Sequence, residues 1–260
     1  MAKMAAINHE DVNPEKTYQA PRDATKVAWS KALSPPGYAL WLTKSELRDG
    51  GTVTWSERHG DDGIYVLSGS MEIGGRTVPA GGALIVESGV ATTALARGTT
   101  RIVHVGSASD TPPADGLLGA PKPDGHHVHV VGPDGHFESG QREGVRAVWF
   151  ADATCETCRI ALFTVEVDGR KDGAPHHHTA DEIIFVLGGA ISMGRAVYGP
   201  GTALSIPGGV RYGFVGDPSG HHFLNFRRDV SEQFNDRDGP GVLETALSRG
   251  GHLVAEPASA

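Results

Sequence analysis

The chain of 260 residues repeats a unit of about 120 residues, and this repeat constrains its fold more than any other feature. Ile64–Val90 aligns with Ile184–Val210 over 27 positions without a gap, and ten of the aligned pairs are identical. Four of the identities are glycine pairs, namely Gly69/Gly189, Gly74/Gly194, Gly81/Gly201 and Gly89/Gly209. A chance likeness between two β-rich stretches would not keep the glycines in register. We therefore expect two copies of one unit that cover nearly the whole chain.

Each unit has the pattern of an all-β fold. Ile183–Leu187 is a short run of β-branched and aromatic residues that a Gly-Gly pair ends, and further short strands follow between turns. The 36 glycines and 16 prolines interrupt the sequence too often for a helix bundle, and only 241–249 has a weak helical period. We predict antiparallel sandwiches or barrels. The predicted parts are an N-terminal unit at 1–108, a linker at 109–125, a C-terminal unit at 126–230 and a tail at 231–260.

Charge and hydropathy argue against several classes of protein. The formal net charge is -8 and no basic stripe is visible, so nucleic acid is not the expected partner. The longest apolar stretch, Ile183–Met193, contains two glycines and is shorter than the roughly 20 residues of a membrane-spanning helix. The N-terminus lacks the pattern of a secretory signal. We expect a cytoplasmic protein with no membrane partner.

Two imidazoles and a carboxylate are spaced as metal ligands at the start of the most apolar run. In an extended segment alternate residues share a face, so His176 and His178 point to one side, and Glu182 follows four residues later. Two histidines and one carboxylate suit non-haem Fe(II), and Mn, Ni, Co or Zn are chemically acceptable. The sequence therefore predicts a mononuclear divalent metal site in the second unit.

This pattern resembles the cupin superfamily, and the duplication resembles a bicupin. The first cupin motif, G-x5-H-x-H-x3-E-x6-G, is matched at His176, His178, Glu182 and Gly189, although Gly169 precedes His176 by one residue too many. The second motif, G-x5-P-x-G-x2-H-x3-N, is matched at three positions, namely Gly201, Pro207 and Gly209. The resemblance covers about 12–108 and 126–230. It implies two tandem antiparallel β-barrels of jelly-roll type, with a metal held by the motif residues.

The second motif departs from the family at its histidine, which is Tyr212 here, and Gly216 stands at the Asn position. A neutral phenol ligates metals poorly, because its pKa is ordinarily near 10. Tyr212 is thus a candidate fourth ligand, a hydrogen-bond donor to substrate, a catalytic general acid, or an aromatic side chain that fills the barrel. His222 and Asn225, on the last strand of the unit, are candidates for hydrogen bonds to the ligands or the substrate.

The same positions of the first unit have lost the motif. The 120-residue offset places Ser56, Arg58, Asp62 and Thr92 where the second unit has His176, His178, Glu182 and Tyr212. Of these four, only Asp62 is a good metal ligand. We expect the first barrel to be structural, with Arg58 paired to Asp61 or Asp62; the alternative is that Arg58 binds an anionic ligand.

The resemblance implies a metal-dependent enzyme that acts on a small organic molecule, and it most favours dioxygenase chemistry. The alternatives are a metal-dependent isomerase or lyase, and a non-enzymatic module that binds a metal or a small ligand. Exposed sheet edges and related proteins suggest a homodimer.

Two further motifs stay open. His126, His127 and His129 flank a short alternating strand that is either the ordinary start of the second barrel or a second metal site. Cys155 and Cys158 form a single C-x2-C motif, which is compatible with a turn carrying free thiols, a disulfide, or a zinc site completed by histidines.

Overall fold

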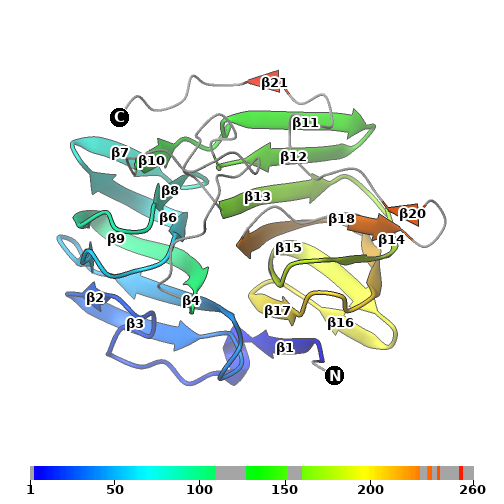
Figure 1. The fold of residues 1–260 in the computed structure, drawn as a ribbon, viewed down its shortest axis with the longest axis horizontal. Coiled ribbons are helices and arrows are strands. Elements are labelled where there is room, and N and C mark those ends of the chain that lie inside the picture. The colour runs from blue at the N-terminus through cyan, green and yellow to red at the C-terminus, as the bar shows by residue number, and fades with distance from the viewer. Residues whose placement is uncertain are drawn as a thin grey trace.

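The computed structural model describes residues 3–108, 127–151 and 160–228, together with short strands at 233–235, 239–240 and 252–253. The described part is almost entirely antiparallel β-structure and contains no α-helix. Figure 1 shows two sheets side by side, one from the first half of the chain and one from the second. The prediction of an all-β fold of antiparallel sheets with little helix is confirmed for the described residues. The predicted linker, both cysteines, His126 and the helical segment at 241–249 lie outside the described residues.

The sheet of the first half, which we call barrel one, has the order β10-β8-β6-β9-β4-β3, with β2, β5 and β7 attached at its sides. Its strands from the first half are β2 (Asp23–Ala24), β3 (Val27–Ala32), β4 (Leu40–Leu47), β5 (Thr52–Trp55), β6 (Asp62–Ile73), β7 (Arg76–Pro79), β8 (Ala83–Val86) and β9 (Thr92–Ser107). Its remaining strand, β10 (Val128–Val131), comes from the second half of the chain.

The sheet of the second half, barrel two, has the order β1-β17-β15-β18-β13-β12-β11-β21, with four short strands beside it. The first strand, β1 (Ala5–Asn8), precedes the 3-10 turn η1 (His9–Asp11). The others are β11 (Phe137–Arg142), β12 (Val145–Trp149), β13 (Ile160–Val167), β14 (Gly173–His178), β15 (Glu182–Met193), β16 (Ala196–Tyr198), β17 (Thr202–Ile206), β18 (Tyr212–Arg228), β19 (Gln233–Asn235), β20 (Gly239–Pro240) and β21 (His252–Leu253).

The first strand of each half pairs with the sheet of the other half. Strand β1 is antiparallel to β17, with Ala5 opposite Ser205, and β10 is antiparallel to β8, with His129 opposite Ile85. In Figure 1 the blue β1 accordingly lies beside the second sheet, and the green β10 lies among the cyan strands. The strand after His127 therefore does not begin the second barrel, because it completes the edge of barrel one. The exchange ties the two barrels together through backbone hydrogen bonds.

A glycine lies at each of the two places where the first strand of one half pairs with the sheet of the other half, which we call the exchange joints. Gly81 and Gly201, which the repeat aligns, have φ angles of 82° and 86°, a left-handed conformation that favours glycine. A side chain at Gly81 would contact Pro133, and a side chain at Gly201 would collide with the ring of His9. The repeat thus holds in backbone conformation as well as in sequence.

The apolar side chains form three buried clusters. One lies between the two sheets and contains residues of both halves, among them Leu42, Val105, Leu162 and Phe226. The second fills barrel one around Trp55, and the third, which is smaller, lies in barrel two and includes Tyr212. The two barrels therefore share one core between them while each keeps an interior of its own.

Candidate functional site

Three strands of barrel two place the predicted metal ligands near one another, although the ligand atoms of His176, His178 and Glu182 do not all lie within 4.8 Å of each other. His176 and His178 lie on β14, Glu182 is the first residue of β15, and Tyr212 is the first residue of β18. His176 pairs directly with Tyr212 across the ladder, and their ring centroids are 4.5 Å apart. The rings of His176 and His178 are 5.0 Å apart, as expected for alternate residues of one strand. His178 and Glu182 are buried, and His176 is partly exposed at the edge of the cluster.

The carboxylate of Glu182 is the centre of this cluster. Tyr212 donates its Oη–H to both carboxylate oxygens, at 3.1 and 2.9 Å. The Asn225 amide donates Nδ2–H to Oε1 at 2.5 Å, and His178 Nε2 lies 3.5 Å from Oε2. The hydroxyl of Tyr212 therefore contacts the Glu182 carboxylate directly. The amide oxygen of Asn225 is buried with no hydrogen-bond partner among the described residues.

The donor chemistry of the cluster fits a divalent metal. The Nδ1 atom of His176 lies 2.6 Å from the backbone oxygen of Ala174, which can only accept, so this nitrogen carries the proton. The lone pair of a neutral His176 is then on Nε2, and a hydrogen bond of this kind to backbone fixes the tautomer of metal-binding histidines. The 3.5 Å between His178 Nε2 and Glu182 Oε2 also matches the separation of about 3.4 Å between two donors on one tetrahedral metal.

The structure adds Arg227 to the cluster and leaves His222 out of it. Arg227 is 4% exposed, and its Nη2 lies 3.7 Å from Glu182 Oε1, while its guanidinium carbon is 5.5 Å from the ring centroid of Phe163. Strand alternation from Asn225 places Arg227 on the same face, so the sequence contained a signal for it. His222 faces away from Asn225; burial lowers its pKa, and Glu166 and Arg146 are its charged neighbours.

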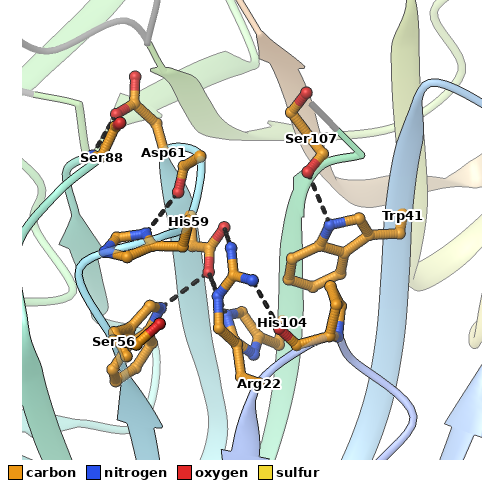
Figure 2. A network of polar contacts seen from close by, with 12 residues as sticks. Arg22, Trp41, Ser56, His59, Asp61, Ser88, His104 and Ser107 are labelled. Atoms are coloured by element: carbon orange, nitrogen blue, oxygen red, sulfur yellow. Dashed lines mark hydrogen bonds and ion pairs between the residues drawn. The ribbon is translucent and has the colours of Figure 1, made fainter. Parts of the chain in front are cut away.

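In barrel one the corresponding carboxylate, that of Asp62, forms a buried ion pair with Arg22. Asp62, the first residue of β6, is fully buried and accepts two hydrogen bonds from Arg22, from Nε at 2.6 Å and from Nη2 at 2.9 Å. The indole of Trp55 donates a third at 2.7 Å. Figure 2 shows Arg22, His104 and Trp41 converging from separate segments of the chain. Arg22 precedes the first long strand of barrel one and carried no sequence signal for this role.

A buried histidine completes the barrel-one cluster. His104 Nε2 lies 3.4 Å from Asp62 Oδ2, and its Nδ1 lies 2.8 Å from the hydroxyl oxygen of Tyr18. Burial lowers the pKa of His104 despite the nearby Asp62 carboxylate, and burial raises the pKa of Tyr18. Both groups are therefore neutral near pH 7, and Arg22 and Asp62 form the charged pair.

Two expectations about barrel one were wrong. Arg58 is exposed and does not pair with Asp62, whose partner is Arg22, and the Asp61 carboxylate accepts a hydrogen bond from the backbone N–H of Ser88. The second error concerns the 120-residue offset between the repeats, which is wrong by one residue on β5. Trp55 pairs with Thr92 as His176 pairs with Tyr212, so a tryptophan, and not Ser56, stands at the position of the first histidine.

Sequence comparisons leave the family open, whereas structural comparisons identify the fold. No protein-family model and no curated protein sequence matches the chain. The putative glyoxylate-induced protein of Pseudomonas aeruginosa has a TM-score of 0.67 and 15% identity, over 88% of this chain and 90% of its own. A putative dioxygenase of Nostoc punctiforme has a TM-score of 0.63 and 10% identity, over 87% and 83%. The oxalate decarboxylase of Bacillus subtilis, which has Mn(II) centres, has a TM-score of 0.59 and 16% identity, over 88% and 78%.

These neighbours establish a cupin fold, and identities this low carry no more than the fold. Among the described residues, no helix is long and apolar enough to cross a membrane.

Proposed function

We propose that the chain is a bicupin enzyme that acts on a small organic molecule at one divalent metal ion in barrel two. The observation that carries the proposal is the grouping of His176, His178 and Glu182 in one barrel, with His178 Nε2 3.5 Å from Glu182 Oε2, set against the ion-paired Asp62 in the other. These three side chains would hold the metal. When bound, the metal would supply Lewis acidity toward a chelating substrate and, as iron, the redox chemistry of a dioxygenase.

The protein residues around the metal ligands have distinct tasks. Tyr212 and Asn225 both donate to Glu182, so they fix the direction of its carboxylate. Tyr212 also holds a proton at this carboxylate, where it can serve as an acid or as a hydrogen-bond donor to substrate. The buried guanidinium of Arg227 brings a permanent positive charge to the cluster, which favours a substrate that carries an anionic oxygen.

We favour a dioxygenase-type reaction with iron, and one structural neighbour is described as a putative dioxygenase. A metal-dependent lyase or isomerase is the second candidate, because Arg227 suits a carboxylate substrate and another neighbour is a decarboxylase with Mn(II). We expect a small-molecule substrate, a homodimer, and neither nucleic acid nor membrane as partner.

Oxygen uptake after metal loading tests the proposal. The full chain, stripped of metal and reloaded with Fe(II) or Mn(II), is offered catechols, β-diketones, hydroxy-ketones and dicarboxylates. Substrate-dependent oxygen consumption by the iron form supports the dioxygenase, and carbon dioxide release without oxygen consumption supports the lyase. Stoichiometric metal binding without turnover of any compound would overturn the enzyme proposal in favour of a binding module.

A further inference from the structure

A second cluster of metal-binding side chains lies at the exchange joint of barrel one, away from the cluster around Glu182. Glu87 directly follows β8, and His127 and His129 lie at the start of the exchanged strand β10. One ligand atom from each of the three side chains lies within 4.8 Å of the other two. Within the described ranges this is the only set of three histidine, cysteine or acidic residues that meets this spacing. We infer that Glu87, His127 and His129 bind a divalent transition-metal ion, which links the second half of the chain to barrel one.

The backbone orients the three side chains toward one point. The N–H of Glu87 donates to the carbonyl of His127 at 3.1 Å, which extends the β8–β10 ladder by one residue. His127 and His129 are alternate residues and therefore share a face, and their ring centroids are 5.8 Å apart. The convergence thus follows from strand pairing and not from a freely moving loop.

The distances and burial suit a metal with nitrogen and oxygen ligands. Glu87 Oε1 lies 2.6 Å from His129 Nε2 and 3.6 Å from His127 Nδ1. Donors bound at 2.0–2.2 Å to one tetrahedral zinc are about 3.4 Å apart, so small side-chain adjustments would admit the ion. Glu87 and His129 are buried, whereas the His127 side chain is 33% exposed and leaves a route from solvent. Two imidazoles and one carboxylate are a ligand set for Zn²⁺ and for neighbouring divalent transition metals.

The other exchange joint shows that the fold does not need these side chains. There β1 pairs with β17 as β10 pairs with β8, with Ala5 opposite Ser205 and His129 opposite Ile85. By this register and the 120-residue offset, the positions of Glu87, His127 and His129 are occupied in the second joint by Pro207, Lys3 and Ala5. The same joint therefore forms without any metal ligand, so the three ligands serve a purpose beyond strand exchange.

Metal titration of the full chain tests the inference. The Glu182→Gln variant is used as the parent, since it removes the carboxylate of the barrel-two cluster and leaves the joint intact. The metal-stripped parent is titrated with Zn²⁺ by calorimetry and with Co²⁺ by visible absorption, which reports nitrogen and oxygen coordination. We expect one equivalent to bind the parent and to raise its Tm.

Single changes in the parent identify the ligands. His127→Ala should weaken binding at least 10-fold, and Glu87→Gln should weaken it at least 100-fold, with loss of the metal-dependent rise in Tm. His127 is partly exposed, so His127→Ala provides the test if Glu87→Gln does not fold. His9→Ala is the matched control, because His9 packs against Gly201 at the other joint and should leave affinity unchanged. A parent that binds no equivalent, or equal affinity in the parent and His127→Ala, would overturn the inference.

Discussion

The two barrels place a carboxylate at the same point of the same strand and surround it differently. Asp62 begins β6 and Glu182 begins β15, and both carboxylates are buried. Around Asp62 are a guanidinium that binds it at two points and an indole that donates to it. Around Glu182 are two imidazoles, a phenol and an amide. One repeated scaffold therefore holds its buried carboxylate in an ion pair in one barrel and among imidazole, phenol and amide groups in the other, where we propose the metal site.

Charge compensation of the buried carboxylate differs between the two barrels. A buried carboxylate is costly unless a positive group faces it, and Arg22 supplies that group in barrel one. In barrel two Arg227 is close to Glu182 at 3.7 Å, too far for the tight pairing seen in barrel one. A bound cation would complete the compensation in barrel two.

The largest expected effect comes from breaking the ion pair of barrel one. Arg22→Ala leaves Asp62 buried without its cation, so we expect the free energy of unfolding to fall by about 3–5 kcal/mol. Urea unfolding followed by circular dichroism measures this loss. The double variant Arg22→Met with Asp62→Leu should recover most of it, since the uncompensated charge is gone. A loss below about 1 kcal/mol in Arg22→Ala would show that the pair does not stabilise barrel one.

A smaller and chemically different effect is expected from Tyr212→Phe in barrel two. The phenol holds Glu182 by hydrogen bonds, so its removal should lower turnover about 10- to 100-fold while unfolding loses only about 1 kcal/mol. Steady-state kinetics with the compound that the unchanged chain turns over in the metal-loading assay, and urea unfolding of the same preparation, measure the two quantities. Unchanged turnover would assign Tyr212 to packing alone.

The stability of barrel one should depend on pH through His104. Burial lowers the pKa of His104 in the folded protein, so below about pH 6.5 the unfolded chain binds a proton that the folded chain refuses. Stability must then fall as pH falls, by up to about 1.4 kcal/mol per pH unit for this one group. His104→Gln should make the decline between pH 7 and pH 5 shallower. An unchanged slope in urea unfolding across this range would contradict the assignment of a neutral His104.

The smallest effect is expected at Arg58. Its side chain is exposed, so Arg58→Ala should change the free energy of unfolding by less than about 0.5 kcal/mol. It serves as the control for Arg22→Ala, since both variants remove one arginine from barrel one. A loss equal to that of Arg22→Ala would mean that the two arginines share the role.

The sequence predicted the features that depend on local pattern and on the repeat. Strand alternation and the duplication were sufficient for the all-β fold and for the recurring glycines, and the alternation placed His176 and His178 side by side on one strand. The motif alignment placed Asp62 correctly, but a shift of one residue on β5 hid Trp55 as the counterpart of His176.

The remaining features depend on contacts between distant segments. Arg22 lies 40 residues before Asp62 in a segment with no strand pattern, and its partner is set only when the barrel closes. Likewise, the alternating strand after His127 has the same local pattern whichever sheet it joins. Only tertiary packing decides that it pairs with β8, and this pairing brings Glu87 to the two histidines.

Metal content of paired carboxylate variants tests most directly the claim that metal chemistry resides in barrel two. Glu182→Gln and Asp62→Asn are purified in parallel with the unchanged chain, and metal per folded chain is measured by mass spectrometry. We predict that Glu182→Gln loses one equivalent of divalent transition metal, whereas Asp62→Asn keeps the content of the unchanged chain. Full metal content in Glu182→Gln, or a lost equivalent in Asp62→Asn, would contradict the assignment.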